Sequence, residues 1–260
     1  MGCFAVILPA AGRSTRFGDP KQKKIYADLD GRAVWLRAVD PFLNRNDVTQ
    51  IIVAIHPDDR ELFERRYRPN VAFLDITVID GGAERHDSIA RALDAIDASC
   101  EFVAVHDAAR PCLTADLVDA LFAATRAHGA AILAVPVTDT LKRADPDGSI
   151  VATVPRAGLF AAQTPQGFRR DLLTRAYANR DATDGPTDDA TLVEALGHRV
   201  VIVEGSPMNL KITTAADLRL AHAILQSLPR PEPDAPGHPF ADERAGWGDL
   251  PKRTPGDLFL

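Results

Sequence analysis

The sequence has few cysteines, no long apolar run and no excess of positive charge, and each absence excludes a class of protein. Its three cysteines, Cys3, Cys100 and Cys112, are odd in number and widely spaced, without a C-x-x-C pair, which favours a reducing compartment over a disulfide scaffold. No apolar run approaches the roughly 20 residues that cross a bilayer. The net charge of −6 argues against a general nucleic-acid binder. We therefore expect a cytoplasmic protein without nucleic-acid or membrane partners.

The 260 residues, 46% of them apolar, suffice for one large α/β domain or two small ones. Short apolar segments alternate with amphipathic helical patterns. The apolar segments are continuous rather than alternating, so both faces of each strand should be buried, which predicts a mostly parallel, doubly wound (Rossmann-like) sheet. The expected strands are 3–9, 48–55, 75–80, 101–106 and 130–136, and the expected helices are 33–44, 58–67, 85–97 and 114–129.

Residues 137–155 interrupt this alternation. The turn sequence Asp145-Pro146-Asp147-Gly148 lies between two β-prone segments, which predicts a hairpin projecting from the sheet. An exposed hairpin usually needs a partner to cover it. A homodimer contact is our first interpretation of this arm, and a flap over the site is the second.

The C-terminal part continues the α/β pattern and then changes composition. Residues 229–260 contain seven of the nineteen prolines, which is typical of a disordered or loosely docked tail. We therefore expect one domain, 1–228, followed by a tail, 229–260. Within the domain, the remaining expected elements are strands 159–165 and 199–205, and helices 169–180, one starting near Thr187, and 214–228.

The first expected strand ends at Pro9 and leads into a turn of small residues, "AAG", followed by several cations. Ligands of open α/β sheets bind beyond the carboxyl ends of the strands. Small residues there let a ligand approach the backbone, whose amides can then point at phosphate oxygens. The residues of this elbow are Ala10, Ala11 and Gly12, with charge supplied by Arg16 and Lys21.

Two common phosphate-binding loops do not fit the elbow. A P-loop needs four residues between its glycines, whereas five separate Gly12 from Gly18. The dinucleotide fingerprint needs a second glycine where Ser14 stands. What remains is a strand, an elbow of small residues and the Pro20-Lys21 pair that follows it.

The segment "LPAAGRSTRFGDPKQ" resembles the signature loop of nucleotidyltransferases of the glycosyltransferase-A type. Four further segments follow: "GGAERHDSI", "HDAARPC", "PVTDTLKR" and "NLKITTAADL". In this order they resemble the 2-C-methyl-D-erythritol 4-phosphate cytidylyltransferase family over residues 3–226. The alternative is the ribitol-5-phosphate cytidylyltransferase group, but "PAAG" and "HDAARP" favour the methylerythritol family.

The resemblance implies CMP transfer from CTP to methylerythritol phosphate, with release of pyrophosphate, in non-mevalonate isoprenoid biosynthesis. The attacking phosphate oxygen is already anionic, so the reaction needs positioning and cations rather than a general base. The chain accordingly shows no Ser-His-Asp or Cys-His constellation. A nucleotide-binding module that has lost catalysis is a further hypothesis, from a different class.

The resemblance also implies roles for individual residues. Asp107 is the candidate ligand for Mg²⁺, a contact to substrate, or both. In relatives, the arginine equivalent to Arg156 reaches the neighbouring subunit's site, and Lys211 is expected to make a buried phosphate contact. The residues implied as catalytic are Arg16, Lys21, Arg156 and Lys211, and those implied in substrate binding are Ala10, Ala11, Gly12, Gly81, Gly82, Ser88, Asp107, Arg110 and Thr140.

Several polar residues near these motifs have a structural interpretation instead. His106 is interpreted as a packed strand residue, because no His or Cys stands at metal-ligand spacing from it. Arg110 is assigned either to holding Asp107 or to contacting substrate. Other structural interpretations are solvent-exposed charges at Lys23 and Lys24, a helix cap at Asp87 or Ser88, and a helix cap at Thr187, with a weaker substrate contact from Thr187 or Asp188.

Overall fold

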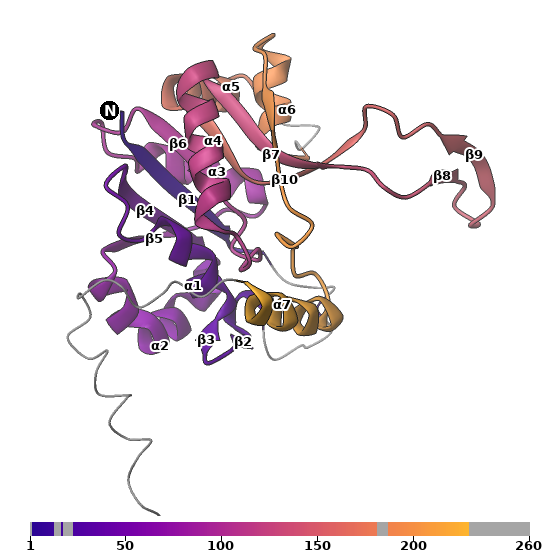
Figure 1. Ribbon diagram of the computed structural model, residues 1–260. Coiled ribbons are helices and arrows are strands. Elements are labelled where there is room, and N and C mark those ends of the chain that lie inside the picture. Colours follow the sequence, from indigo (N-terminus) through magenta and orange to yellow (C-terminus); the bar gives the residue numbers. More distant parts are fainter. Residues whose placement is uncertain (1, 13–16, 18–22, 181–186, 229–260) are drawn as a thin grey trace, which may run out of the picture. The chain divides into compact units, whose positions relative to one another are not determined.

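The alternating strands and helices form a seven-stranded sheet with helices on both faces (Figure 1). The computed structural model describes residues 2–12, 17, 23–180 and 187–228. The chain divides into a unit of residues 1–226 and a second of 227–260, and the sheet belongs to the first. In order across the sheet, the strands are β11 (Val201–Glu204), β7 (Ala130–Pro136), β10 (Phe160–Arg169), β6 (Phe102–Val105), β1 (Phe4–Ala10), β4 (Val48–Ile55) and β5 (Ile76–Asp80).

The sheet is parallel except at one strand. β1 pairs in parallel with β4 and β6, while β10 runs antiparallel to both β6 and β7. The predicted mostly parallel sheet is confirmed. Several boundaries differ from those expected. The first strand ends at Ala10 rather than Pro9, and β10 extends to Arg169 because Gln166 to Arg169 pair with β6. The helix expected over 33–44 ends at Val39, and the helix expected over 58–67 continues to Phe73.

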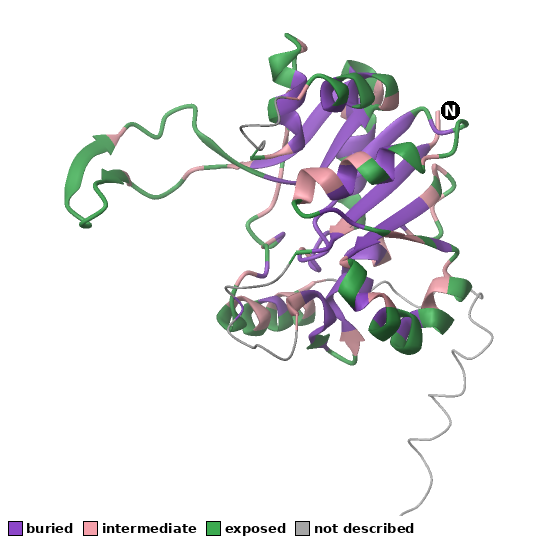
Figure 2. Ribbon diagram, turned by 180° about the vertical axis from the view of Figure 1, so that it is seen from behind, coloured by how far each residue is buried: buried purple, intermediate pink, exposed green. Residues whose placement is uncertain are grey.

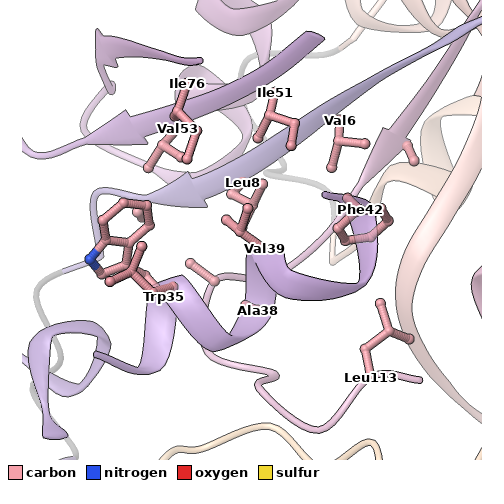
Figure 3. Close-up of a cluster of buried hydrophobic side chains, with 14 of the residues drawn as sticks. Val6, Leu8, Trp35, Ala38, Val39, Phe42, Ile51, Val53, Ile76 and Leu113 are labelled. Atoms are coloured by element: carbon pink, nitrogen blue, oxygen red, sulfur yellow. The ribbon is translucent and has the colours of Figure 1, made fainter. Parts of the chain in front are cut away.

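Two apolar layers bury the two faces of the sheet, because alternate residues of a strand point to opposite sides. Val6 and Leu8 of β1 pack in one layer with Trp35 and Phe42 (Figure 3), whereas Ile7 packs in the other. The doubly wound prediction is therefore confirmed. The first layer is covered by α1 (Val34–Val39), the 3-10 turn η3 (Asp40–Phe42), α2 (Arg60–Phe73) and α4 (Ala115–His128), and the second by α3 (Arg85–Asp94), α5 (Arg170–Ala178) and α6 (Asp189–Ala195).

A third apolar cluster holds the last helix, α7 (Ala215–Ser227), against the segment that follows the elbow. Ala221 of α7 packs with Leu29 and Val34, and Ile212 is fully buried just before the helix. The backbone N–H of Ile212 donates to the carbonyl of Ala109, 2.8 Å away. This packing carries residues 209–213 across the carboxyl edge of β6. The small elements of this region are η2 (Lys24–Tyr26), β2 (Asp28–Leu29), β3 (Arg32–Ala33) and η4 (Pro57–Asp59).

The predicted hairpin is confirmed. It consists of β8 (Leu141–Ala144) and β9 (Ile150–Val154) and projects from the sheet on two long connections (Figure 1). The N–H of Gly148 donates to the carbonyl of Asp145, and the φ of +87° at Gly148 suits glycine. The arm is almost entirely exposed (Figure 2), including Ile150 and Val151.

The predicted helix cap at Thr187 is wrong, whereas the one at Asp87 is confirmed as part of a capping box whose N-cap residue is Glu84. α6 begins at Asp189, and the carboxylate of Asp188 rather than Thr187 accepts from the N–H of Thr191 at 3.0 Å. A carboxylate suits this position because it accepts strongly and complements the helix dipole. In α3 the N-cap is Glu84; the side chain of Asp87 accepts from the Glu84 N–H at 3.2 Å within a capping box.

The cysteines are all free thiols, with Cys100 and Cys112 buried. In the part of the chain that the structure describes, no helix combines the length and the apolar character needed to span a membrane. The predicted tail, 229–260, lies outside the described residues.

Candidate active site

A cavity of about 490 Å³ opens beyond the carboxyl ends of β1 and β6, where the sequence predicts ligand binding. This volume is in the range of small-molecule sites. The predicted site residues that line it are Ala10, Ala11, Gly12, Gly82, Ser88, Asp107 and Lys211. They are joined by Pro9, Lys24, Ile25, Ala83, Glu84, Arg85, Ala108 and Ala109.

The small residues of the elbow leave space for a ligand on one side and allow close packing against the 81–82 turn on the other. Among the described residues, a Cβ added at Gly12 would meet nothing within 4 Å, so they leave the space beside this backbone open to a ligand. A Cβ added at Gly81 would lie 2.6 Å from the Cβ of Ala11, so the 81–82 turn packs directly against the elbow. Gly81 is buried and supports the cavity without lining it.

Ser88 holds the 82–84 loop in place. The N–H of Gly82 donates to the Ser88 Oγ at 3.0 Å, and this hydroxyl donates to the carbonyl of Glu84 at 3.1 Å. Ser88 is fully buried and its proton is already used, so a contact to nucleotide would have to use its free lone pair. The substrate-binding role implied for Gly82 and Ser88 stays a prediction.

Asp107 is the electrostatic centre of the site. Arg85 Nε lies 3.1 Å from its Oδ1, Lys211 Nζ lies 2.7 Å from its Oδ2, and Arg110 Nε lies 4.0 Å from its Oδ2. Burial by itself would raise the pKa of Asp107, but the charges of Arg85, Lys211 and Arg110 hold this pKa well below its usual range. The carboxylate is therefore ionised at neutral pH.

Sequence reasoning missed Arg85, which the structure places in the cavity wall. Its Nη2 lies 2.8 Å from the fully buried Asp189, whose other oxygen accepts from the Tyr177 hydroxyl at 2.5 Å. Burial lowers the pKa of Arg85, yet the charges of Asp189 and Asp107 outweigh this and raise it. The available signal was a cation within "GGAERHDSI", directly after the glycine turn.

Lys211 lines the cavity, but its surroundings differ from those expected. It lies in an extended segment outside any strand, and its side chain is 39% exposed rather than buried. The Asn209 amide holds this segment by donating to the carbonyl of Thr164 at 2.9 Å. The Lys211 ammonium is therefore paired with Asp107 and accessible from the cavity.

Arg110 and His106 are supporting residues behind the cavity wall. Arg110 Nη1 donates to the Asn209 carbonyl at 2.6 Å, and Arg110 does not line the cavity, which favours holding Asp107 over contacting substrate. His106 is fully buried, with Nε2 3.1 Å from the Arg110 carbonyl. Burial lowers the pKa of His106 to about 4, so the ring is neutral near pH 7. The interpretation of His106 as a packed residue is confirmed.

The two lysines assigned to solvent are both placed differently. Lys23 Nζ lies 2.7 Å from Asp59 Oδ2, which also accepts from the Tyr26 hydroxyl at 3.1 Å. Lys24 lines the cavity. The ion pair joins residues 36 apart in sequence, so local pattern could not indicate it. Arg16 and Lys21 lie outside the described residues.

Two predicted residues lie away from the cavity of their own chain. Thr140 directly precedes β8 and Arg156 lies just after β9, and neither lines the cavity. Arg156 Nη1 donates to the carbonyl of Thr138. Their predicted role in a neighbouring subunit's site stays a prediction.

The donor set fits a divalent cation held mainly by phosphate oxygens. Among the described residues no group of three or more His, Cys, Asp or Glu side chains could enclose a metal ion. Asp107 offers one carboxylate to the cavity. Mg²⁺ commonly binds one or two carboxylates together with substrate phosphates. Asp107 thus fits as a single ligand.

Comparisons with known proteins agree with this geometry. The model of the family "IspD: 2-C-methyl-D-erythritol 4-phosphate cytidylyltransferase" matches residues 4–227. The Rhodopirellula baltica enzyme of that name is 44% identical, with 86% of this chain and 97% of the relative covered, and the Frankia casuarinae enzyme is 48% identical, with 85% and 80% covered. The crystal structure of the Thermus thermophilus enzyme, 34% identical, superposes with a TM-score of 0.71 over 87% of this chain and 100% of that one. Because the family model covers nearly the whole first unit, the chain belongs to the IspD family of cytidylyltransferases.

Proposed function

We propose that this chain transfers CMP from CTP to 2-C-methyl-D-erythritol 4-phosphate, giving 4-diphosphocytidyl-2-C-methyl-D-erythritol and pyrophosphate, in the cytoplasm. The observation that carries the proposal is a cavity with a small-residue elbow on one side and a carboxylate surrounded by cations on the other. The names of the relatives support the same reaction.

The reaction requires the negatively charged phosphates of CTP and the acceptor to be brought together, and it needs no proton transfer to the nucleophile. A phosphate oxygen of the acceptor attacks the α-phosphorus of CTP, the new P–O bond forms, and the bond to pyrophosphate breaks. Catalysis of this kind rests on positioning and on cations at the developing charge. The open backbone at Gly12 gives the triphosphate its place, and Ala10 and Ala11 keep that wall free of bulk.

Lys211, Arg16 and Lys21 are the proposed cationic donors. The Lys211 ammonium is partly exposed at the cavity wall and 2.7 Å from Asp107, so a short movement would bring it to a phosphate. Arg16 and Lys21 follow the elbow directly in sequence. Asp107 is held by Arg85 and Arg110 and would position the Lys211 ammonium at the cavity wall. It is also the residue that would hold Mg²⁺. When bound, Mg²⁺ would neutralise phosphate charge.

We also propose that the hairpin arm forms a homodimer contact. Ile150 and Val151 on β9 and Phe160 at the base of the arm are exposed apolar residues. Arg156 and Thr140 on the connections would then contribute to the cavity of a second copy.

The test is pyrophosphate release from CTP and Mg²⁺ with methylerythritol phosphate, compared with ribitol 5-phosphate and with no acceptor. Release with methylerythritol phosphate alone is expected. Release with ribitol 5-phosphate alone would keep the mechanism and replace the substrate. No release with either acceptor, but binding of CTP, would favour a nucleotide-binding module.

A further inference from the structure

A chain of polar contacts runs from the cavity into the second apolar layer, which includes Tyr177. It passes from Asp107 to Arg85, from Arg85 to Asp189, and from Asp189 to Tyr177, with distances of 3.1, 2.8 and 2.5 Å. Asp189 is 0% and Tyr177 is 3% exposed. The four side chains come from the end of β6, α3, α6 and α5, so the chain joins elements distant in sequence.

Asp189 is itself fixed by the start of α6. The amide of Gln166, on β10, donates to Asp188 Oδ2 at 2.9 Å, and its oxygen accepts from the Ala190 N–H at 3.1 Å. Gln166 is buried in the sheet. The carboxylate of Asp189 therefore projects from a backbone that is anchored on both sides of the residue.

We propose that Asp189 and Tyr177 are positioning residues, which hold the Arg85 guanidinium so that its Nε binds Asp107 and the Asp107 carboxylate faces Lys211. This inference rests on the proposed function. Arginine binds carboxylates with directional hydrogen bonds. Because the guanidinium is planar and rigid, the bond from Nη2 to Asp189 also fixes the direction of the Nε–H toward Asp107. An Arg85 released from Asp189 would be free to turn toward the triphosphate, and Asp107 would lose its support.

The variants are Tyr177→Phe, which removes one hydroxyl, and Asp189→Asn, which keeps the shape and removes the charge. At saturating substrates and well below the unfolding temperature, kcat should fall by about 3-fold for Tyr177→Phe and by 10-fold to about 10²-fold for Asp189→Asn, as misplacement in a site does. Two matched controls should keep the wild-type kcat. One is Tyr67→Phe, which changes a buried tyrosine of α2, and the other is Asp171→Asn, which changes an aspartate paired with the exposed Arg169.

A mutant cycle separates positioning from a general structural role. In an Arg85→Lys background, Asp189→Asn should lower kcat by less than about 2-fold, because both residues act through one contact. The full factor in that background, or an unchanged kcat in both single variants, would overturn the proposal.

A spectroscopic readout keeps the test independent of activity. In the wild-type chain the Arg85 Nε–H, identified by its loss in Arg85→Lys, should give a protected proton–nitrogen NMR signal near neutral pH. Tyr177→Phe should broaden it, and Asp189→Asn should remove it. An identical Arg85 signal in wild type and both variants would refute the positioning role, whether or not the chain is active. Failure of the wild-type chain to release pyrophosphate would refute the proposed function and would leave the NMR test in place.

Discussion

Asp107 shows how a single residue can be both buried and charged. An unpaired carboxylate in this position would be protonated or would destabilise the fold, because burial penalises its charge. Arg85 and Lys211 within 3.1 Å, and Arg110 behind them, reverse that penalty. The surplus of positive charge around one carboxylate leaves the cavity attractive to a polyphosphate.

At the same scale, removal of one cation should affect turnover more than folding. Lys211→Ala and Lys21→Ala should each lower kcat by about 10²-fold or more, as loss of one transition-state donor does. The circular dichroism spectrum and the unfolding midpoint of Lys211→Ala should stay close to wild type, because its side chain is 39% exposed. Arg65→Ala, an exposed cation on α2 away from the cavity and the arm, is the control. A near-wild-type rate would remove the substituted lysine from the mechanism.

The three thiols should differ in reactivity. Burial raises the pKa of Cys112 to about 12, and this side chain is 1% exposed. At Cys3, which is partly exposed, the hydroxyl of Thr49 lowers the pKa. Thiolate is the reactive form, so Ellman's reagent should modify Cys3 first and leave Cys112 unmodified in the native chain near pH 8. Cys112 should react after addition of urea; equal native rates for the two would contradict this ordering.

Among the elements, the start of α7 controls where Lys211 lies. Asp217 Oδ2 accepts from the N–H groups of Thr213 and Thr214, both at 2.8 Å, and from the Thr213 hydroxyl at 2.6 Å. The hydrogen bond from the Thr213 side chain is the main cause that lowers the pKa of Asp217 to about 2. These bonds fix the turn that follows Lys211.

Asp217→Ala should therefore lower the free energy of unfolding by about 1 kcal/mol near pH 7. The folded-state pKa lies below the ordinary value of 3.8, so the stabilisation is complete above that value and is lost as pH falls toward 2. Urea unfolding near pH 7 and near pH 3 should show the gap between wild type and variant narrowing at the lower pH. A gap that widened there would contradict this assignment.

The hairpin arm should carry dimerisation. Deletion of residues 143–149 should give monomers in light scattering, and Ile150→Asp should weaken the dimer. Phe73→Asp, a similar change at an exposed apolar residue of α2, is the control for loss of apolar surface. An intact dimer after the deletion would place the interface elsewhere.

On the scale of the whole molecule, the apolar core formed by the described residues lies within the first unit. All three apolar clusters are built from residues between Phe4 and Leu225. A chain ending at Leu228 should therefore keep its kcat and its unfolding temperature within about 2 °C of the full chain. A chain ending at Thr214 should be much less stable, because Ala221 and Leu218 of α7 fill the third cluster. Loss of activity on removal of 229–260 alone would assign the tail a role.

The local pattern of the chain was enough for the main architecture. Continuous apolar strands such as 4–10, alternating with amphipathic helices, indicate an α/β sheet whose two faces are covered, as in a doubly wound sheet. The small residues of the elbow and of Gly81-Gly82, together with Asp107 at a strand end, indicated the place of the cavity. These features depend on side-chain size, spacing and strand direction, which short segments of the sequence are enough to indicate.

Only the tertiary structure decided which charges meet. Lys23 pairs with Asp59, Arg85 joins Asp107 to Asp189, and Lys211 approaches Asp107 from 104 residues away in sequence, as their positions 107 and 211 show. Such pairs depend on the crossing of separate elements, which no local spacing encodes. The sequence by itself thus determined the sheet, the elbow and the family resemblance, whereas packing determined the partners of each charge, because an electrostatic contact is set by distance in space and not by distance along the chain.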